Sequence, residues 1–125
     1  MSDEFEQTVR LRNSKTFLPT KMVRRDLFSQ IKGPGAPQTI VIRNPESTMG
    51  RSEEADIRFL SNRVSRKHAK LHNSETELYC TDLNSHNGLL INGIEVHAVA
   101  LRDGDTLQMG DIVLVYHQGV QWASM

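Results

Sequence analysis

The stretch "RVSRKHAKLHNSETELYCTDLNSHNGLLING", residues 63–93, contains the pattern from which we predict the secondary structure of the chain. Two segments inside it, "HAKLH" and "ELYCTDL", alternate apolar and polar residues, which is typical of strands with one buried face. The pairs Asn87-Gly88 and Asn92-Gly93 follow them. Such pairs readily adopt the positive φ angles that tight hairpins need. The stretch therefore predicts short antiparallel strands joined by tight turns.

The same pattern extends over the chain from Gln38 onwards. Turn residues separate the further apolar runs "QTIVIR", "IRFL", "LLI", "IEVHAVAL", "DTLQM" and "IVLVYH". Strands that recur at intervals of roughly 8–12 residues are typical of antiparallel sandwiches and barrels. We therefore predict an all-β, antiparallel β-sandwich over residues 36–119, followed by a short C-terminal tail, 120–125.

Residues 1–35 differ in pattern, and we interpret them as an N-terminal extension with a flexible tail and a short helix. The helix is predicted over residues 20–32, "TKMVRRDLFSQIK". Thr20 can cap it, and Val23, Leu27 and Ile31 recur every fourth residue as one apolar stripe. The following Gly-Pro-Gly would end it.

Composition narrows the class of protein. The 125 residues have room for one domain, and 15 basic residues balance 15 acidic ones. A neutral chain has no overall field that would attract nucleic acid or anionic lipid. The N-terminus lacks the apolar core of a signal peptide, and no apolar run is long enough to cross a membrane. We therefore expect a cytoplasmic protein with no membrane association.

The sequence lacks the motifs of common enzymes and metal sites. Cys80 is the single cysteine, which excludes an intramolecular disulfide and a cysteine-based zinc site. We expect it to be a small buried side chain rather than a nucleophile. His68 and His72 would share one strand face, but a metal needs a third ligand. There is no Gly-x-Ser-x-Gly or His-Glu-x-x-His motif. We predict no enzyme activity, no metal and no cofactor.

Three predicted loops carry the chemically active residues: 47–56, 61–68 and 84–88. Arg51, Ser65 and Arg66 form a set of charged and neutral donors that suits the acceptor oxygens of a phosphate. Asn87 can both donate and accept, which suits a peptide main chain. If the loops converge at one end of the sandwich, they would hold a phosphate and the backbone that carries it.

A basic cluster leaves a nucleic-acid alternative open. It consists of Arg63, Arg66, Lys67 and Lys70. Zero net charge and the scarcity of nearby aromatic side chains for base stacking argue against it. We predict no nucleic-acid partner.

Four ordered blocks resemble the forkhead-associated (FHA) domain family over residues 49–116. They are Gly50-Arg51, "SRKHA" at 65–69, "DLNSHNGLLINGIEV" at 82–96 and "LRDGDTLQMG" at 101–110. The resemblance implies a phosphothreonine-binding β-sandwich of signalling proteins. It implies that Arg51, Ser65 and Arg66 contact the phosphate and that Asn87 binds the peptide main chain. It also implies structural roles, which it gives to Gly50, His68, Gly88, Asn92 and Gly93.

His86 stands at a position where members of the family frequently carry Thr or another side chain. An imidazole at this position would either crowd the pocket for the threonine methyl group or, if charged, contact the ligand, with affinity rising as pH falls. In the N-terminal extension, Thr8 follows acidic residues and precedes Leu11 by three positions. Two interpretations of Thr8 stay open: a chance threonine in a flexible tail, or a phosphosite that docks on the binding site of its own chain or of a second copy. Docking on a second copy would give self-association.

We therefore predict a phosphothreonine-peptide-binding module that acts with a Ser/Thr protein kinase and its phosphorylated protein partners. Regulation of this module by Thr8 is a further hypothesis. The alternative is a module of the same fold that binds proteins independently of phosphorylation, with a degenerate pocket.

Overall fold

The computed structural model describes residues 20–124, with side chains described for residues 24–119. Residues Arg25–Gly119 form one compact unit, which contains every site discussed below. The described part of a second unit, Met1–Arg24 with Val120–Met125, consists of the first residues of β1 and the last residues of β11. The described residues include no helix, and so none that could cross a membrane.

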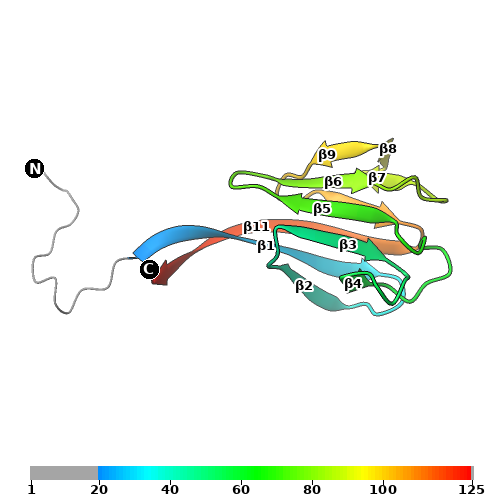
Figure 1. Ribbon diagram of the computed structural model, residues 1–125, viewed down its shortest axis with the longest axis horizontal. Helices are drawn as coiled ribbons and strands as arrows, with labels where there is room; N and C mark the ends of the chain where they lie inside the picture. Colours follow the sequence, from blue (N-terminus) through cyan, green and yellow to red (C-terminus); the bar gives the residue numbers. More distant parts are fainter. Residues whose placement is uncertain (1–19, 125) are drawn as a thin grey trace, which may run out of the picture. The chain divides into compact units, whose positions relative to one another are not determined.

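Eleven strands make up the described fold (Figure 1). They are β1 Thr20–Lys32, β2 Gln38–Ile42, β3 Glu46–Gly50, β4 Ile57–Arg58, β5 Ala69–Asn73, β6 Leu78–Asp82, β7 Leu89–Ile91, β8 Ile94–Val96, β9 Ala98–Ala100, β10 Thr106–Met109 and β11 Ile112–Ser124.

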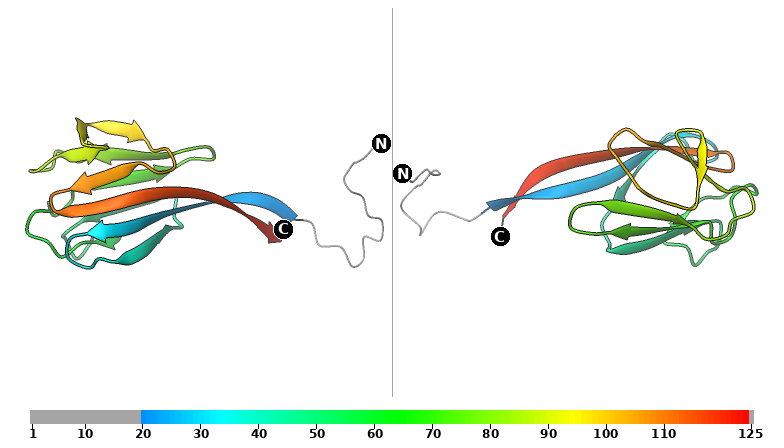
Figure 2. Two further views of the ribbon diagram at one scale, coloured as in Figure 1. Left: turned by 180° about the vertical axis from the view of Figure 1, so that it is seen from behind. Right: turned by 90° about the horizontal axis from the view of Figure 1, so that it is seen from above.

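Two sheets pack face to face as a sandwich. The six-stranded sheet has the order β2-β1-β11-β10-β7-β8, and the five-stranded sheet has the order β4-β3-β5-β6-β9. The right-hand view of Figure 2 separates the green strands of the second sheet from the blue and red strands of the first. The strand pairs β1–β2, β3–β5, β5–β6, β6–β9, β7–β8, β7–β10 and β10–β11 are antiparallel. Strand β4 pairs with β3 in parallel over two residue pairs. The predicted β-sandwich is confirmed.

The alternation seen in the sequence places the core between the sheets. Ala69 and Leu71 of β5 are buried while Lys70 and His72 face outwards. Other strands contribute in the same way, and the largest buried apolar side chains are Tyr116, Phe28, Phe59, Met49, Leu71, Leu78, Leu89, Leu107, Met109, Ile112 and Leu114. The core therefore fixes the strands and leaves their connecting loops to carry other chemistry.

The helix predicted over residues 20–32 is wrong, because this segment is strand β1. A spacing of four residues places side chains on one face of a helix, but also on one face of a strand, whose period is two. In the strand, Asp26, Phe28 and Gln30 are buried, whereas Ile31 of the apolar stripe is 52% exposed. Pairing with β2 in the sheet thus overrides the local helical pattern.

The buried polar residues of β1, Asp26 and Gln30, form hydrogen bonds. Their presence on the inward face is the reason why the sequence pattern did not indicate a strand. The hydroxyl of Tyr116 donates to Asp26 at 2.6 Å. The Gln30 amide donates to the carbonyl oxygen of Pro34 at 2.9 Å and so braces the turn into β2. Gly33 in that turn has φ +94°. The Gly-Pro-Gly segment therefore forms a hairpin turn rather than a helix end.

Two further differences concern strand boundaries. Residues 46–50 form strand β3, although most of this segment was predicted to be loop; Ser47 and Met49 face inwards. The run "IEVHAVAL" contains two strands, β8 and β9, which belong to different sheets and are separated by His97. The Asn92-Gly93 turn has positive φ at both residues, as predicted, while at Asn87-Gly88 only the glycine does.

Candidate phosphopeptide-binding site

Three loops meet at one end of the sandwich, the right-hand end in Figure 1. They are residues 51–56 after β3, residues 59–68 before β5, and residues 83–88 between β6 and β7. Hydrogen bonds from the first and third loops converge on the short segment 63–65 of the second loop. The convergence expected from the sequence is therefore present.

Arg51 is fixed at both its backbone and its side chain. Its N–H donates to the carbonyl oxygen of Ser65 at 3.0 Å, and its Nε donates to the carbonyl oxygen of Val64 at 3.1 Å. The guanidinium group is planar with five donors in a fork. Since the Nε edge is used by the protein, the two terminal nitrogens are left for an oxyanion.

Ser65 lies between the first and third loops. Its Oγ accepts the backbone N–H of His86 at 2.9 Å. A hydroxyl that accepts one hydrogen bond still has its own proton to donate. The side chain is half-buried, so that this proton can reach a bound ligand. The imidazole of His86 is exposed.

Asn87 has one amide hydrogen engaged and the rest of its side chain available. Its Nδ2 donates to the carbonyl oxygen of Arg63 at 2.7 Å, which orients the carboxamide. The second amide hydrogen and Oδ1 take part in no hydrogen bond with the described residues. One donor and one acceptor are what a peptide main chain requires.

His68 supports these loops from the interior and is fully buried. The N–H of Ser65 donates to its Nδ1 at 3.0 Å, while its Nε2 lies 2.7 Å from the carbonyl oxygen of Gly88. Because Nδ1 must accept, the proton is on Nε2 and is donated to Gly88. One neutral imidazole thus ties the second loop to the third.

Close backbone contact explains the glycines. A Cβ on Gly50 would lie 2.1 Å from the carbonyl oxygen of Arg66. That carbonyl accepts the N–H of Ser52 at 3.1 Å, whereas the side chain of Arg66 is exposed. Gly88 has φ +81° and Gly110 has φ +59°, with the backbone of Arg63 against Gly110. Any larger residue at Gly50 would push the first and second loops apart.

Several supporting residues were not found from the sequence. The carbonyl groups of Arg63 and Val64 hold the two key side chains, and a main-chain acceptor leaves no trace in residue type. Ser85 donates to Asp82 at 2.5 Å and accepts the N–H of Gly88 at 2.9 Å. The Asp-x-x-Ser spacing, typical of side chains that bond nearby backbone, was the available signal.

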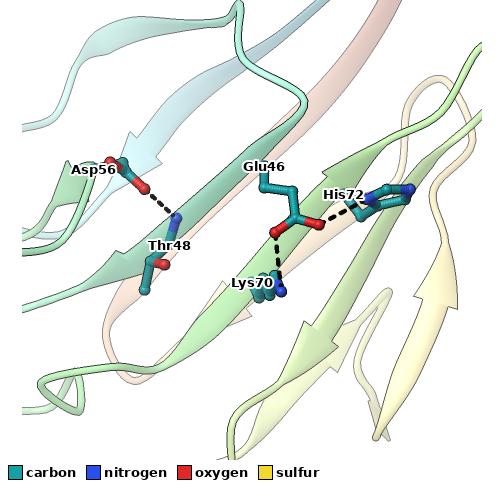
Figure 3. A network of polar contacts seen from close by, with 5 residues as sticks. All are labelled: Glu46, Thr48, Asp56, Lys70 and His72. Atoms are coloured by element: carbon teal, nitrogen blue, oxygen red, sulfur yellow. Dashed lines mark hydrogen bonds and ion pairs between the residues drawn. The ribbon is translucent and has the colours of Figure 1, made fainter.

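A second polar cluster lies on the outer face of the five-stranded sheet. Figure 3 shows Glu46 of β3 between Lys70 and His72 of β5, at 3.0 and 3.3 Å. Lys70, by hydrogen bond and charge, lowers the pKa of Glu46 below its usual 4.5, and His72 adds to this. Asp56 nearby accepts the backbone N–H of Thr48 at 2.8 Å. The cluster is exposed, and within the described residues no third side chain joins Glu46 and His72 to make a metal site.

The described residues contain no group of three or more side chains able to hold a metal ion. Cys80 is buried, as predicted, and burial, with the charge of Asp82 second, raises the pKa of its thiol to about 12. A thiol with such a pKa is protonated at neutral pH and is not a nucleophile.

Comparison with known proteins agrees with this geometry. The chain is 34% identical over 88 residues to the oxoglutarate dehydrogenase inhibitor of Corynebacterium glutamicum, covering 70% of this chain but only 62% of that relative. A solved structure from an analysis of phosphothreonine-dependent FHA domain interactions has 26% identity and a TM-score of 0.69, covering 74% of this chain and 95% of that one.

A second solved structure, of Mycobacterium tuberculosis EmbR in complex with a low-affinity phosphopeptide, also has 26% identity and a TM-score of 0.69. It covers 74% of this chain and 24% of that one. The model of the FHA domain family matches residues 47–110, which include all three loops of the site. The chain therefore belongs to the FHA domain family.

Proposed function

We propose that this chain binds phosphothreonine peptides at the site formed by Arg51, Ser65 and Asn87. The observation that carries the proposal is the fixed guanidinium of Arg51. Its Nε is held by a backbone carbonyl at 3.1 Å, so its terminal nitrogens are oriented before a ligand arrives. Such preorganisation lowers the entropic cost of binding.

The neighbouring groups complement a phosphorylated peptide. The free proton of Ser65 would bond a second phosphate oxygen, and the exposed Arg66 would contribute charge. Asn87 would bond the peptide main chain through its unused amide hydrogen and oxygen. His86 lies beside Ser65 through its backbone, so its side chain would border the ligand.

The relatives support a regulatory binding role rather than catalysis. One is an inhibitor of a dehydrogenase, and one solved relative holds a phosphopeptide. By this analogy, the chain would act in the cytoplasm on proteins phosphorylated by a Ser/Thr kinase. The chain covers 62% of that inhibitor's length. A regulatory activity like that of the whole inhibitor is therefore only proposed for this chain.

The test compares Arg51→Gln with the unchanged protein by isothermal titration calorimetry. The ligands are one peptide in phosphothreonine, phosphoserine and unphosphorylated forms. Loss of the Arg51 charge should cost about 2–5 kcal/mol of binding free energy, as for other hydrogen-bonded charge pairs. Arg43→Gln is the matched control, because Arg43 is an exposed cation that follows β2 and precedes the opposite end of β3.

Two results would oppose the proposal. Equal affinity for the phosphorylated and unphosphorylated peptides would favour the alternative, a phosphorylation-independent interaction module. Equal losses from Arg51→Gln and Arg43→Gln would show that the cost is general electrostatics rather than a contact at the site. A degenerate library of phosphothreonine peptides supplies the sequence to be tested.

The proposal includes regulation by Thr8, which lies outside the described residues. Phosphorylated Thr8 would occupy the Arg51 site of its own chain or of a second copy. Protein phosphorylated at Thr8 should then show either weaker peptide binding at unchanged mass in solution or a doubled mass. If neither the peptide affinity nor the mass changes, Thr8 has no such role.

A further inference from the structure

Arg58 is a second arginine whose side chain is held in place, here against the backbone of Arg51. The parallel pairing of β4 with β3 sets Arg58 opposite Gly50, the residue that precedes Arg51. The Nε of Arg58 donates to the carbonyl oxygen of Arg51 at 3.0 Å. The N–H of Phe59 fixes the same strand by donating to the carbonyl oxygen of Gly50 at 2.9 Å. The two arginines therefore share one mode of anchoring, Nε on a carbonyl.

Apart from this Nε bond, the guanidinium of Arg58 makes no hydrogen bond or ion pair with the side chains and backbone that the structure describes. Within residues 24–119, no carboxylate lies within ion-pair distance of either guanidinium. The nearest acid in sequence, Asp56, is engaged by the backbone N–H of Thr48 at 2.8 Å. By contrast, Lys70 on the same sheet is paired with Glu46. Arg58 thus combines a fixed position with an uncompensated charge.

We propose that Arg58 is a second oxyanion-binding subsite, which selects phosphopeptides carrying another negative group close to the phosphothreonine. This inference rests on the proposed function. The group can be a carboxylate or a second phosphate, since both accept a bidentate guanidinium. An extended peptide advances about 3.3 Å per residue. Because Arg58 is adjacent to the Arg51 loop, the second anion lies within about three residues of the phosphothreonine.

The test uses one phosphothreonine peptide with uncharged flanking residues and a series based on it. Each member of the series carries one glutamate, or one additional phosphothreonine, at one position from three before to three after. Affinities are measured at 50 and 300 mM salt. At the best position, glutamate should strengthen binding about threefold and phosphothreonine about tenfold at low salt. Both gains should shrink at high salt.

Three variants locate the effect. Arg58→Gln should abolish the gain from the second anion and leave the affinity for the uncharged-flank peptide within about twofold. Arg58→Lys should keep part of the gain, because the charge remains while the fork is lost. Arg43→Gln should keep all of it.

Each failure has a distinct meaning. If no position in the series strengthens binding, or if Arg58→Gln leaves the gain intact, the subsite is refuted while the proposed function stands. If Arg58→Gln weakens every peptide equally, Arg58 only positions Arg51 and the subsite is likewise refuted. If the uncharged-flank phosphopeptide does not bind at all, the proposed function itself fails.

Discussion

Two polar clusters of this protein look alike as residue lists but are built differently. The loop cluster of Arg51, Ser65, His68 and Asn87 is held almost wholly by backbone partners, with His68 fully buried. The sheet-face cluster of Glu46, Lys70 and His72 is held by side chains alone, and their side chains are 45–54% exposed (Figure 3).

The difference between the two clusters indicates which kind of interaction makes a polar cluster rigid. A buried hydrogen bond that is lost leaves an unpaired polar group in a dry interior, which is costly. An exposed ion pair that is lost is replaced by water and salt ions, so it contributes little. We therefore expect the loop cluster to control stability and ligand binding, and the sheet-face cluster to control little beyond local charge.

The largest loss of stability is expected at Gly50. Comparing Gly50 with Gly93 distinguishes the cost of a close contact from the cost of an unfavourable backbone conformation. Gly50→Ala places a methyl group 2.1 Å from a backbone oxygen, and should lower the free energy of unfolding by about 3–5 kcal/mol. Gly93→Ala is the control: Gly93 has φ +84° but nothing within 4 Å of the added carbon. It should cost only about 1 kcal/mol. Urea unfolding measures both, and equal costs would refute a special role for the Gly50 contact.

The next effect compares two histidines four residues apart, His68 in the loop just before β5 and His72 within β5. His68→Phe keeps an aromatic ring but leaves the N–H of Ser65 and the carbonyl of Gly88 unpaired. It should cost about 2–4 kcal/mol of unfolding free energy. Phosphopeptide affinity should fall with it, because Ser65 and the third loop lose their common support.

His72→Phe provides the matched comparison, since His72 is exposed and its ring lies against Tyr79 at 6.3 Å between centroids. That change should leave both the unfolding midpoint and the peptide affinity nearly unchanged. A loss from His72→Phe as large as that from His68→Phe would show that the sheet face is as tightly built as the loops.

Much of the fold could be predicted, because an alternation of apolar and polar residues indicates a strand with one buried face. The runs that became β5, β6, β10 and the start of β11 place apolar residues on one face, and each became a strand. β1 and β3 could not be predicted in this way. Their inward faces include the polar residues Asp26, Gln30 and Ser47. The partner of Asp26 is the hydroxyl of Tyr116, far along the chain, so its pairing leaves no local pattern.

The candidate site likewise has a part that the sequence could predict and a part that it could not. Charged and amide side chains with strong chemical character, such as Arg51 and Asn87, were identifiable from residue type and from the order of the motifs. Their anchors are carbonyl groups of Val64 and Arg63, which any residue would supply. The placement of Arg58 next to the first loop could not be predicted, because it comes from a parallel pairing of only two residue pairs, too short to leave a pattern in the sequence.

The smallest expected effect tests the sheet-face cluster through Glu46. Lys70 lowers the pKa of this carboxyl below 4.5, so the folded state favours the charged form. The resulting stability is fully present above pH 4.5 and is lost as pH falls through the folded pKa. Glu46→Gln should therefore differ slightly from the unchanged protein in urea unfolding at pH 7, and the difference should vanish in acid.

High salt should also remove that difference and move the titration of Glu46, followed by NMR, back towards 4.5. The reason is that water and ions reach all three side chains, which are about half exposed. If the difference at pH 7 instead persisted in high salt and matched that of His68→Phe, exposure would not be what separates the two clusters. The backbone anchoring of the loops would then lose its place as the source of their rigidity.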